Sequence, residues 1–221
     1  MSGTTTLTLY AHPFSSYCQK VLIALYENAT PFALRMMGTP EVNADLAALW
    51  PMKKMPLLVD GERTVKESSV IIEYLGLHHP GPVRLIPADA AAALEVRCMD
   101  RCFDNYVMAP LQQIVNDALR PEEHRNPQDR VNARAQLDTA YRWLDGYMAG
   151  RTWAVGSDFS LADCAAAPAL CYADWGHPIP EAFAHLRSYR RRLLARPSYA
   201  RAVDEARPFR PYFPLGAPDR D

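Results

Sequence analysis

A hairpin led by a proline constrains the fold of this chain more than any other segment. Residues 53–69 read Lys-Lys-Met-Pro-Leu-Leu-Val-Asp-Gly-Glu-Arg-Thr-Val-Lys-Glu-Ser-Ser. Leu57–Val59 is a short apolar run, Asp60-Gly61 is a pair typical of tight hairpins, and Thr64 begins a return strand. A helix is predicted to begin at Ser68, because serines there precede an apolar run. The segment therefore predicts strand, turn, strand and helix.

The Met55-Pro56 step and the Glu67-Ser68 pair predict a binding site at one end of this hairpin. Proline at the head of a core strand donates no hydrogen bond and is a candidate for a cis bond, so the main chain of Met55 stays free to pair with an extended peptide. Glu67 and Ser68 combine a carboxylate, a hydroxyl and the unpaired N–H groups of a helix start. That combination suits an amino-acid head group that carries both charges.

A third motif lies in the second half of the chain. Ser160 followed by Asp163 is a variant of the capping box, with Phe159 placed to staple the turn. The helix that follows, past Leu170 towards Trp175, is apolar almost all round and predicts the buried axis of a helical domain. We interpret Ser160 and Asp163 as structural residues.

Together, Met55-Pro56, Glu67-Ser68 and Ser160-x-x-Asp163 resemble the glutathione transferase family over essentially the full chain. The resemblance implies that glutathione lies along Met55 with its glutamyl end at Glu67 and Ser68. It also implies an α/β N-terminal thioredoxin-like domain followed by an all-α C-terminal helical bundle domain. The expected boundaries are 1–80 for the first domain, 81–87 for a linker rich in proline, and 88–221 for the second domain with an irregular tail.

The order of predicted elements agrees with that fold class. Residues 7–10 alternate as a strand, 21–25 belong to a helix, and 32–35 form a second, parallel strand. Residues 88–119 form a long helical stretch that we expect to bend near Pro110, and 127–148 form another. Two further helices are expected at 180–195 and 198–206. The run Arg190–Arg192 is interpreted as a solvated face.

Composition excludes several partners. The chain has 221 residues and a formal net charge of −1, so no basic excess attracts nucleic acid or an anionic membrane. No apolar run approaches the roughly 18 residues needed to span a bilayer, and Met1–Thr6 lacks the features of a signal peptide. We therefore expect a soluble cytoplasmic protein.

Cysteine usage predicts reduced thiols and no metal. The five cysteines form no C-x-x-C pair, which argues against a disulfide framework. Cys98 and Cys102 are four residues apart on a predicted helix, but no histidine stands at ligand spacing, so packing is favoured over metal binding.

The predicted catalytic residue is Ser15, in the loop from the first strand into the first helix. The resemblance implies this position, because several branches of the family carry the catalytic serine or cysteine six residues before the apolar residue that corresponds to Val21. A hydroxyl donor at a helix start stabilises a thiolate and lowers its pKa from about 8.5. Ser16 remains an alternative, and an N-cap role is compatible with either serine. Cys18 lies three residues later and is expected to pack against the sheet, while Tyr10 and Tyr17 remain possible donors.

Two further groups are implied around the ligand. Lys54 precedes Met55 where the family often has a basic residue, so it is a candidate for the glycyl carboxylate of glutathione; Lys53 stands where glycine is common, and which lysine reaches the ligand stays open. The electrophile pocket is expected between the domains, and its possible walls are Phe14, Arg101, Asn105, Tyr106 and Met108.

The resulting hypothesis is a glutathione transferase of the serine type that acts in detoxification and takes a small apolar electrophile. Glutathione is the co-substrate, and the family resemblance implies a homodimer. The alternatives are a glutathione-dependent isomerase or dehalogenase at the same site, and a binding or scaffold protein without enzymatic activity.

Overall fold

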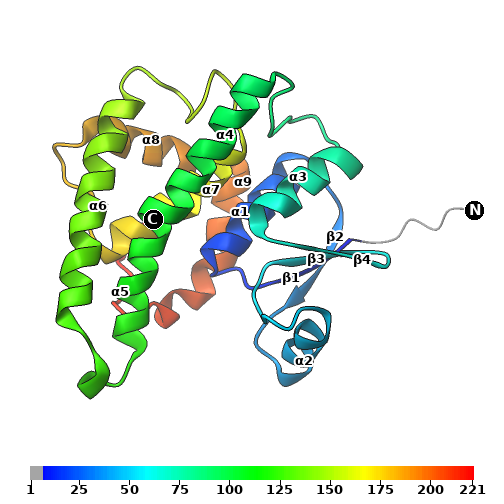
Figure 1. The fold of residues 1–221 in the computed structure, drawn as a ribbon, viewed down its shortest axis with the longest axis horizontal. Helices are drawn as coiled ribbons and strands as arrows, with labels where there is room; N and C mark the ends of the chain where they lie inside the picture. The colour runs from blue at the N-terminus through cyan, green and yellow to red at the C-terminus, as the bar shows by residue number, and fades with distance from the viewer. Residues whose placement is uncertain (1–6) are drawn as a thin grey trace, which may run out of the picture.

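The computed structural model describes residues 7–221 (Figure 1). The expectation about a signal peptide concerns Met1–Thr6, which lie outside the described residues. A small mixed sheet with its helices occupies the first part of the chain, and helices make up the second. The predicted fold class, an α/β domain followed by an all-helical domain, is confirmed.

The sheet has the strand order β2-β1-β3-β4. Its strands are β1 (Leu7–Ala11), β2 (Phe32–Met36), β3 (Leu57–Asp60) and β4 (Arg63–Lys66). The first two are parallel, and the other two neighbouring pairs are antiparallel. Gly61 lies in the β3–β4 turn with φ of 60°, a conformation that glycine adopts without steric cost.

Helices lie on both sides of this sheet. On one side are α1 (Ser16–Glu27) and α3 (Ser68–His78), and α2 (Pro40–Leu49) lies on the other (Figure 1). Val42 and Leu46 of α2 pack with Tyr10 and Leu57 of the sheet in a small separate cluster. The side chain of Thr39 caps α2, and Pro40 occupies its first turn, where a missing N–H costs nothing. A threonine followed by proline is a helix-start signal that the sequence itself carries at this point.

The second domain is built around one buried helix. Its elements are α4 (Ala90–Cys102), a π turn (Phe103–Met108), α5 (Ala109–Leu119), α6 (Pro127–Met148), α7 (Leu161–Gly176), α8 (Ala184–Leu194) and α9 (Pro197–Ala206). Residues 161–174 of α7 are all buried, which confirms the predicted axis. The capping box is also confirmed, because Asp163 Oδ2 accepts a hydrogen bond of 2.9 Å from the backbone N–H of Ser160.

The long helical stretch is interrupted earlier than expected. The structure places a π turn at Phe103–Met108, just ahead of Pro110. Proline within a helix removes a donor and crowds the preceding turn, and a π turn is one way to accommodate it. Pro110 itself sits in the first turn of α5, where proline is tolerated.

One continuous apolar core joins the two parts of the chain. Buried residues of α1, including Val21 and Leu25, belong to the same cluster as Leu170 of α7 and Ala202 of α9. The first helix is therefore held by the sheet and by the helical domain together. No helix in the described part of the chain is both long and apolar enough to cross a membrane.

Candidate functional site

A cleft of about 300 Å3 opens beside Met55 and Pro56. The peptide bond between these residues is cis, as predicted. The cleft walls come from the β3 and α3 starts, from α1 and from the α4–π turn region. Its lining residues are Tyr17, Trp50, Lys54, Met55, Pro56, Glu67, Ser68, Arg101, Asp104 and Asn105. Five residues predicted to bind glutathione, Lys54, Met55, Pro56, Glu67 and Ser68, thus lie together.

The backbone of Glu67 is strained at the edge of this cleft. It has φ of 67° and ψ of 121°, an unusual conformation for a residue with a side chain. Strain of this kind costs of order 1–3 kcal/mol and concentrates at ligand sites. Glu67 also stands at the N-cap of α3 without capping it through its side chain. The first N–H groups of α3 are therefore available to an anionic ligand.

The two lysines differ in their positions. Lys54 lines the cleft, whereas Lys53 has φ of 53° in the left-handed region that favours glycine. Lys53 therefore holds a backbone conformation that glycine adopts more readily than lysine does.

Ser15 stands at the N-cap of α1. Its Oγ accepts a hydrogen bond of 3.4 Å from the backbone N–H of Cys18, and its own N–H donates to His12 O at 3.0 Å. The cap uses the oxygen of Ser15 only as an acceptor, so the hydroxyl can also act as a donor. Ser15 is half-buried, whereas Ser16 is buried, so Ser15 is the more accessible of the two serines.

Cys18 lies inside the first domain, away from solvent. It is fully buried, and this burial raises the pKa of its thiol to about 11. A nucleophilic cysteine needs the opposite shift and some exposure. The geometry agrees with the expectation that Cys18 packs against the sheet.

Tyr17 is the hydroxyl group that the structure adds to the cleft. The sequence offers Tyr17, beside Tyr10, as a possible donor. Burial, together with the carboxylate of Asp104, raises the pKa of Tyr17, so its hydroxyl keeps its proton at neutral pH. It faces the same cleft as Met55 and Glu67.

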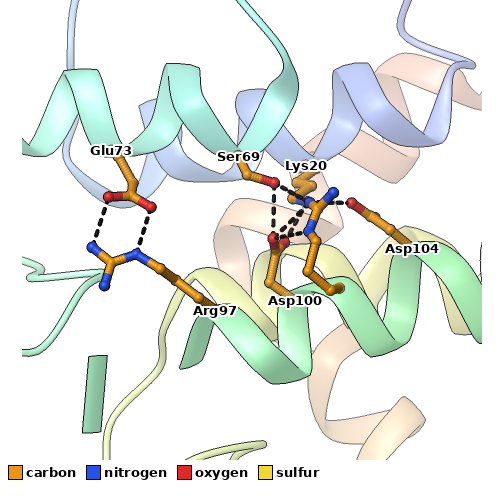
Figure 2. A network of polar contacts seen from close by, with 7 residues as sticks. Lys20, Ser69, Glu73, Arg97, Asp100 and Asp104 are labelled. Carbon is orange, nitrogen blue, oxygen red and sulfur yellow. Dashed lines mark hydrogen bonds and ion pairs between the residues drawn. The ribbon is translucent and has the colours of Figure 1, made fainter. Parts of the chain in front are cut away.

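A network of buried ion pairs forms the wall of the cleft on the α4 side (Figure 2). Lys20 of α1, which is 1% exposed, pairs with Asp100 and lies 2.8 Å from Asp104 Oδ2. Its Nζ also lies 2.9 Å from Ser69 Oγ, which donates to Asp100 Oδ2 at 2.8 Å. Arg101, half-exposed, covers the two aspartates on the solvent side. The network therefore joins α1 and α3 to the helical domain.

Comparison with known proteins decides the family. Residues 9–83 match the family Glutathione S-transferase, N-terminal domain, and residues 104–197 match Glutathione S-transferase, C-terminal domain. This chain belongs to the glutathione S-transferase family. Together the two matches span most of the chain.

Relatives of this chain within the family carry different names. It is 26% identical over 206 residues to the stringent starvation protein A homolog of Coxiella burnetii, covering 90% of this chain and 92% of that protein. It is 29% identical over 217 residues to a Vibrio cholerae protein named "Probable maleylacetoacetate isomerase", covering 92% and 98%. A glutathione S-transferase structure from Methylobacterium radiotolerans, in complex with glutathione sulfonate, superposes with a TM-score of 0.77 at 28% identity, covering 90% and 95%.

The residues that the sequence suggested as walls of an electrophile pocket do not lie together. Arg101 and Asn105 line the cleft beside Met55. Tyr106 is 63% exposed and faces an apolar pocket of about 580 Å3 between the π turn and α6, while Met108 is buried. Tyr106 follows Arg101 by five residues, a spacing that places two side chains on different faces of a helix, so it points away from the cleft.

Phe14 lies with the C-terminal tail. It packs edge-on against Tyr172 at 5.3 Å between ring centroids, and only about 10 Å3 of open space remains there. In the tail, Phe209 contacts His12 at 4.6 Å between ring centroids. The tail therefore covers one side of the loop that carries Ser15.

Metal ligation finds no support within residues 7–221. No group of three or more His, Cys, Asp or Glu side chains there is arranged to hold an ion.

Proposed function

We propose that this glutathione S-transferase binds glutathione along Met55 and activates its thiolate for attack on a small apolar electrophile. The observation that carries the proposal is the convergence of the free main chain of Met55, the strained Glu67 and the uncapped start of α3 on one cleft. The Methylobacterium radiotolerans relative, crystallised with glutathione sulfonate, supports a ligand of this class.

In this proposal the glutamyl ammonium pairs with Glu67, and the glutamyl carboxylate meets Ser68 and the N–H groups of α3. Lys54 is placed to meet the glycyl carboxylate. Met55 pairs with the cysteinyl main chain, which directs the sulfur towards the start of α1. Each end of the tripeptide thus meets a group of opposite charge or a donor.

Ser15 is the proposed catalytic residue. Its hydroxyl donates to the glutathione sulfur, and together with the dipole of α1 it favours the thiolate over the thiol. The thiolate then attacks the electrophile, the new carbon–sulfur bond forms, and Ser15 makes no covalent bond. The aromatic side chains around Phe14 supply an apolar surface next to this loop.

The test is a thiolate absorbance titration of the glutathione complex. Ser15→Ala should raise the thiol pKa by about one unit or more, since a charge-assisted hydrogen bond is worth about 1.5 kcal/mol or more. Turnover at neutral pH should fall about tenfold or more and recover partly at higher pH. Ser16→Ala and Cys18→Ala are the matched controls. A shift in Tyr17→Phe with none in Ser15→Ala would assign the donor to Tyr17 instead.

Two alternatives use the same cleft, and the names of the relatives motivate both. A glutathione-dependent isomerase or dehalogenase would turn over unsaturated or halogenated acids without accumulating a conjugate. A binding or scaffold protein would retain glutathione but show no turnover with any of these substrates. Product analysis with halogenated and unsaturated acids, run beside glutathione calorimetry, separates the three.

The proposal also covers the oligomeric state, the cellular location and the physiological role of the protein. The family resemblance implies a homodimer, a cytoplasmic location and a role in detoxification. Light scattering coupled to size-exclusion chromatography tests the homodimer, for which the expected mass is twice the 24.8 kDa of one chain.

A further inference from the structure

Arg101 uses only part of its hydrogen-bonding capacity inside the protein. Its Nε donates to Asp100 Oδ2 at 3.0 Å, and its Nη2 donates to Asp100 Oδ2 at 2.7 Å and to Asp104 Oδ2 at 2.6 Å. No acceptor within residues 7–221 engages Nη1. Since a guanidinium is planar with five N–H donors in fixed directions, the two N–H groups of Nη1 remain for a ligand.

The neighbouring charges already balance without a ligand. Lys20 and Arg101 carry two positive charges, which offset the carboxylates of Asp100 and Asp104. Glu67, on the same cleft, forms no ion pair with any residue in 7–221. The cleft therefore offers a free donor pair and a separate carboxylate, which together suit a zwitterionic amino acid.

We infer that Arg101 is a specificity residue that recognises the α-carboxylate of the γ-glutamyl group through Nη1. This rests on the proposed binding of glutathione and adds a cation from the helical domain to the donors at Ser68. An arginine recognises a carboxylate through directed N–H groups, so the contact selects for the presence and the position of that carboxylate.

Asp100 and Asp104 act as positioning residues in this arrangement. They accept hydrogen bonds from one edge of the guanidinium. Lys20 in turn holds both carboxylates from the buried side (Figure 2). Asp104 and Asn105 of the π turn line the same cleft as Arg101. Turns of this type occur often at functional sites.

The experiment compares three ligands in calorimetry. They are glutathione, 4-aminobutyryl-cysteinylglycine, which lacks the α-carboxylate, and glutaryl-cysteinylglycine, which lacks the α-ammonium group. The wild-type chain should bind the analogue without the carboxylate at least about tenfold more weakly than glutathione. In Arg101→Gln the affinity for glutathione should exceed that for the analogue without the carboxylate by only about twofold. The ratio of the affinities for glutathione and for the analogue without the ammonium group should stay as in the wild type.

Arg97→Gln is the matched control, because Arg97 also lies on α4 but pairs with Glu73 outside the cleft. It should keep both ligand ratios. If Arg101→Gln unfolds, Asp100→Asn/Arg101→Gln removes one charge of each sign and should show the same loss of selectivity.

The outcomes separate this inference from the function on which it rests. A wild-type chain that binds no glutathione overturns both. A wild-type chain that binds glutathione, with an unchanged carboxylate ratio in the Arg101 variant, overturns the role of Arg101 alone. The role of Arg101 is supported if Arg101→Gln loses the preference for glutathione over the analogue without the carboxylate, while Arg97→Gln keeps that preference.

Discussion

Lys20 Nζ lies 2.8 Å from Asp104 Oδ2, and this ion pair joins the first helix of the sheet domain to the π turn of the helical domain. Both side chains are buried, so neither charge keeps a full hydration shell. Burial raises the pKa of Asp104, and the nearby ammonium group of Lys20 opposes that shift. The pair is therefore a point where folding of the two domains is coupled.

Removal of Lys20 should destabilise the protein strongly. Lys20→Met leaves the carboxylates of Asp100 and Asp104 with Arg101 as their only cation, and breaking a buried pair in this way costs about 3–5 kcal/mol. Urea unfolding measures the change. Arg97→Met, which breaks the exposed pair with Glu73, should cost about 1 kcal/mol or less. Equal losses in the two variants would contradict the coupling role of Lys20.

The capping box should carry a large share of the stability of the helical domain. Asp163 is 0% exposed and accepts hydrogen bonds from Ala154 N, Ser160 N and Tyr189 Oη. Asp163→Ala leaves these buried donors without an acceptor, so the free energy of unfolding should fall by about 3 kcal/mol or more, as measured by thermal or urea unfolding. Asp158→Ala, on the preceding exposed loop, should stay within about 0.5 kcal/mol. A mild effect of Asp163→Ala would show that water replaces the lost acceptor.

Glutathione affinity should depend on the charge of Glu67. Glu67→Ala should weaken binding at least about tenfold in calorimetry, because it removes the proposed partner of the glutamyl ammonium. Glu67→Gln keeps the shape and removes only the charge, so a similar loss there identifies the charge as the cause. Glu62→Ala, on the β3–β4 turn, is the control and should bind normally. Unchanged affinity in Glu67→Ala would remove this residue from the site.

Cys18 should be chemically silent at neutral pH. With a pKa of about 11 its thiolate fraction at pH 7 is roughly one in ten thousand, and this fraction rises about tenfold per pH unit up to the pKa. Iodoacetamide should therefore label the exposed Cys98 first, as read by mass spectrometry. Cys18→Ala should leave turnover within about twofold. Rapid labelling of Cys18, or loss of activity in Cys18→Ala, would contradict this prediction and make Cys18 a candidate nucleophile.

The parts of the fold that could be predicted were those with local signals. The proline before β3, the Asp60-Gly61 turn and the Ser160 capping box each act within a few residues of the chain, so their sequence patterns are specific. The common position of the glutathione-binding candidates could be predicted because they are also close in the sequence: four of them, Met55, Pro56, Glu67 and Ser68, flank one hairpin.

What could not be predicted depends on contacts between distant segments. The π turn shows no distinctive residue pattern, so its place in the helical stretch could not be predicted. Tyr106 was expected beside Arg101 but lines a different pocket, against α6. Lys20 read as an ordinary residue of a helix, because its partners lie 80 and 84 positions away. The role of Tyr17 was equally hidden, since only the folded chain places it in the cleft.

The π turn also provides a way for the residues that line the cleft to change between related chains. A π turn holds one residue more than the α-helical turn it replaces, and π turns are found mostly as single turns within α-helices. A chain shorter by one residue at this point would run through as a continuous α-helix with its later side chains in about the same directions, and only the residues of the turn itself would face differently. A single-codon deletion could therefore exchange the groups that face the amino-acid end of the ligand while every residue of the β3–α3 hairpin stays the same.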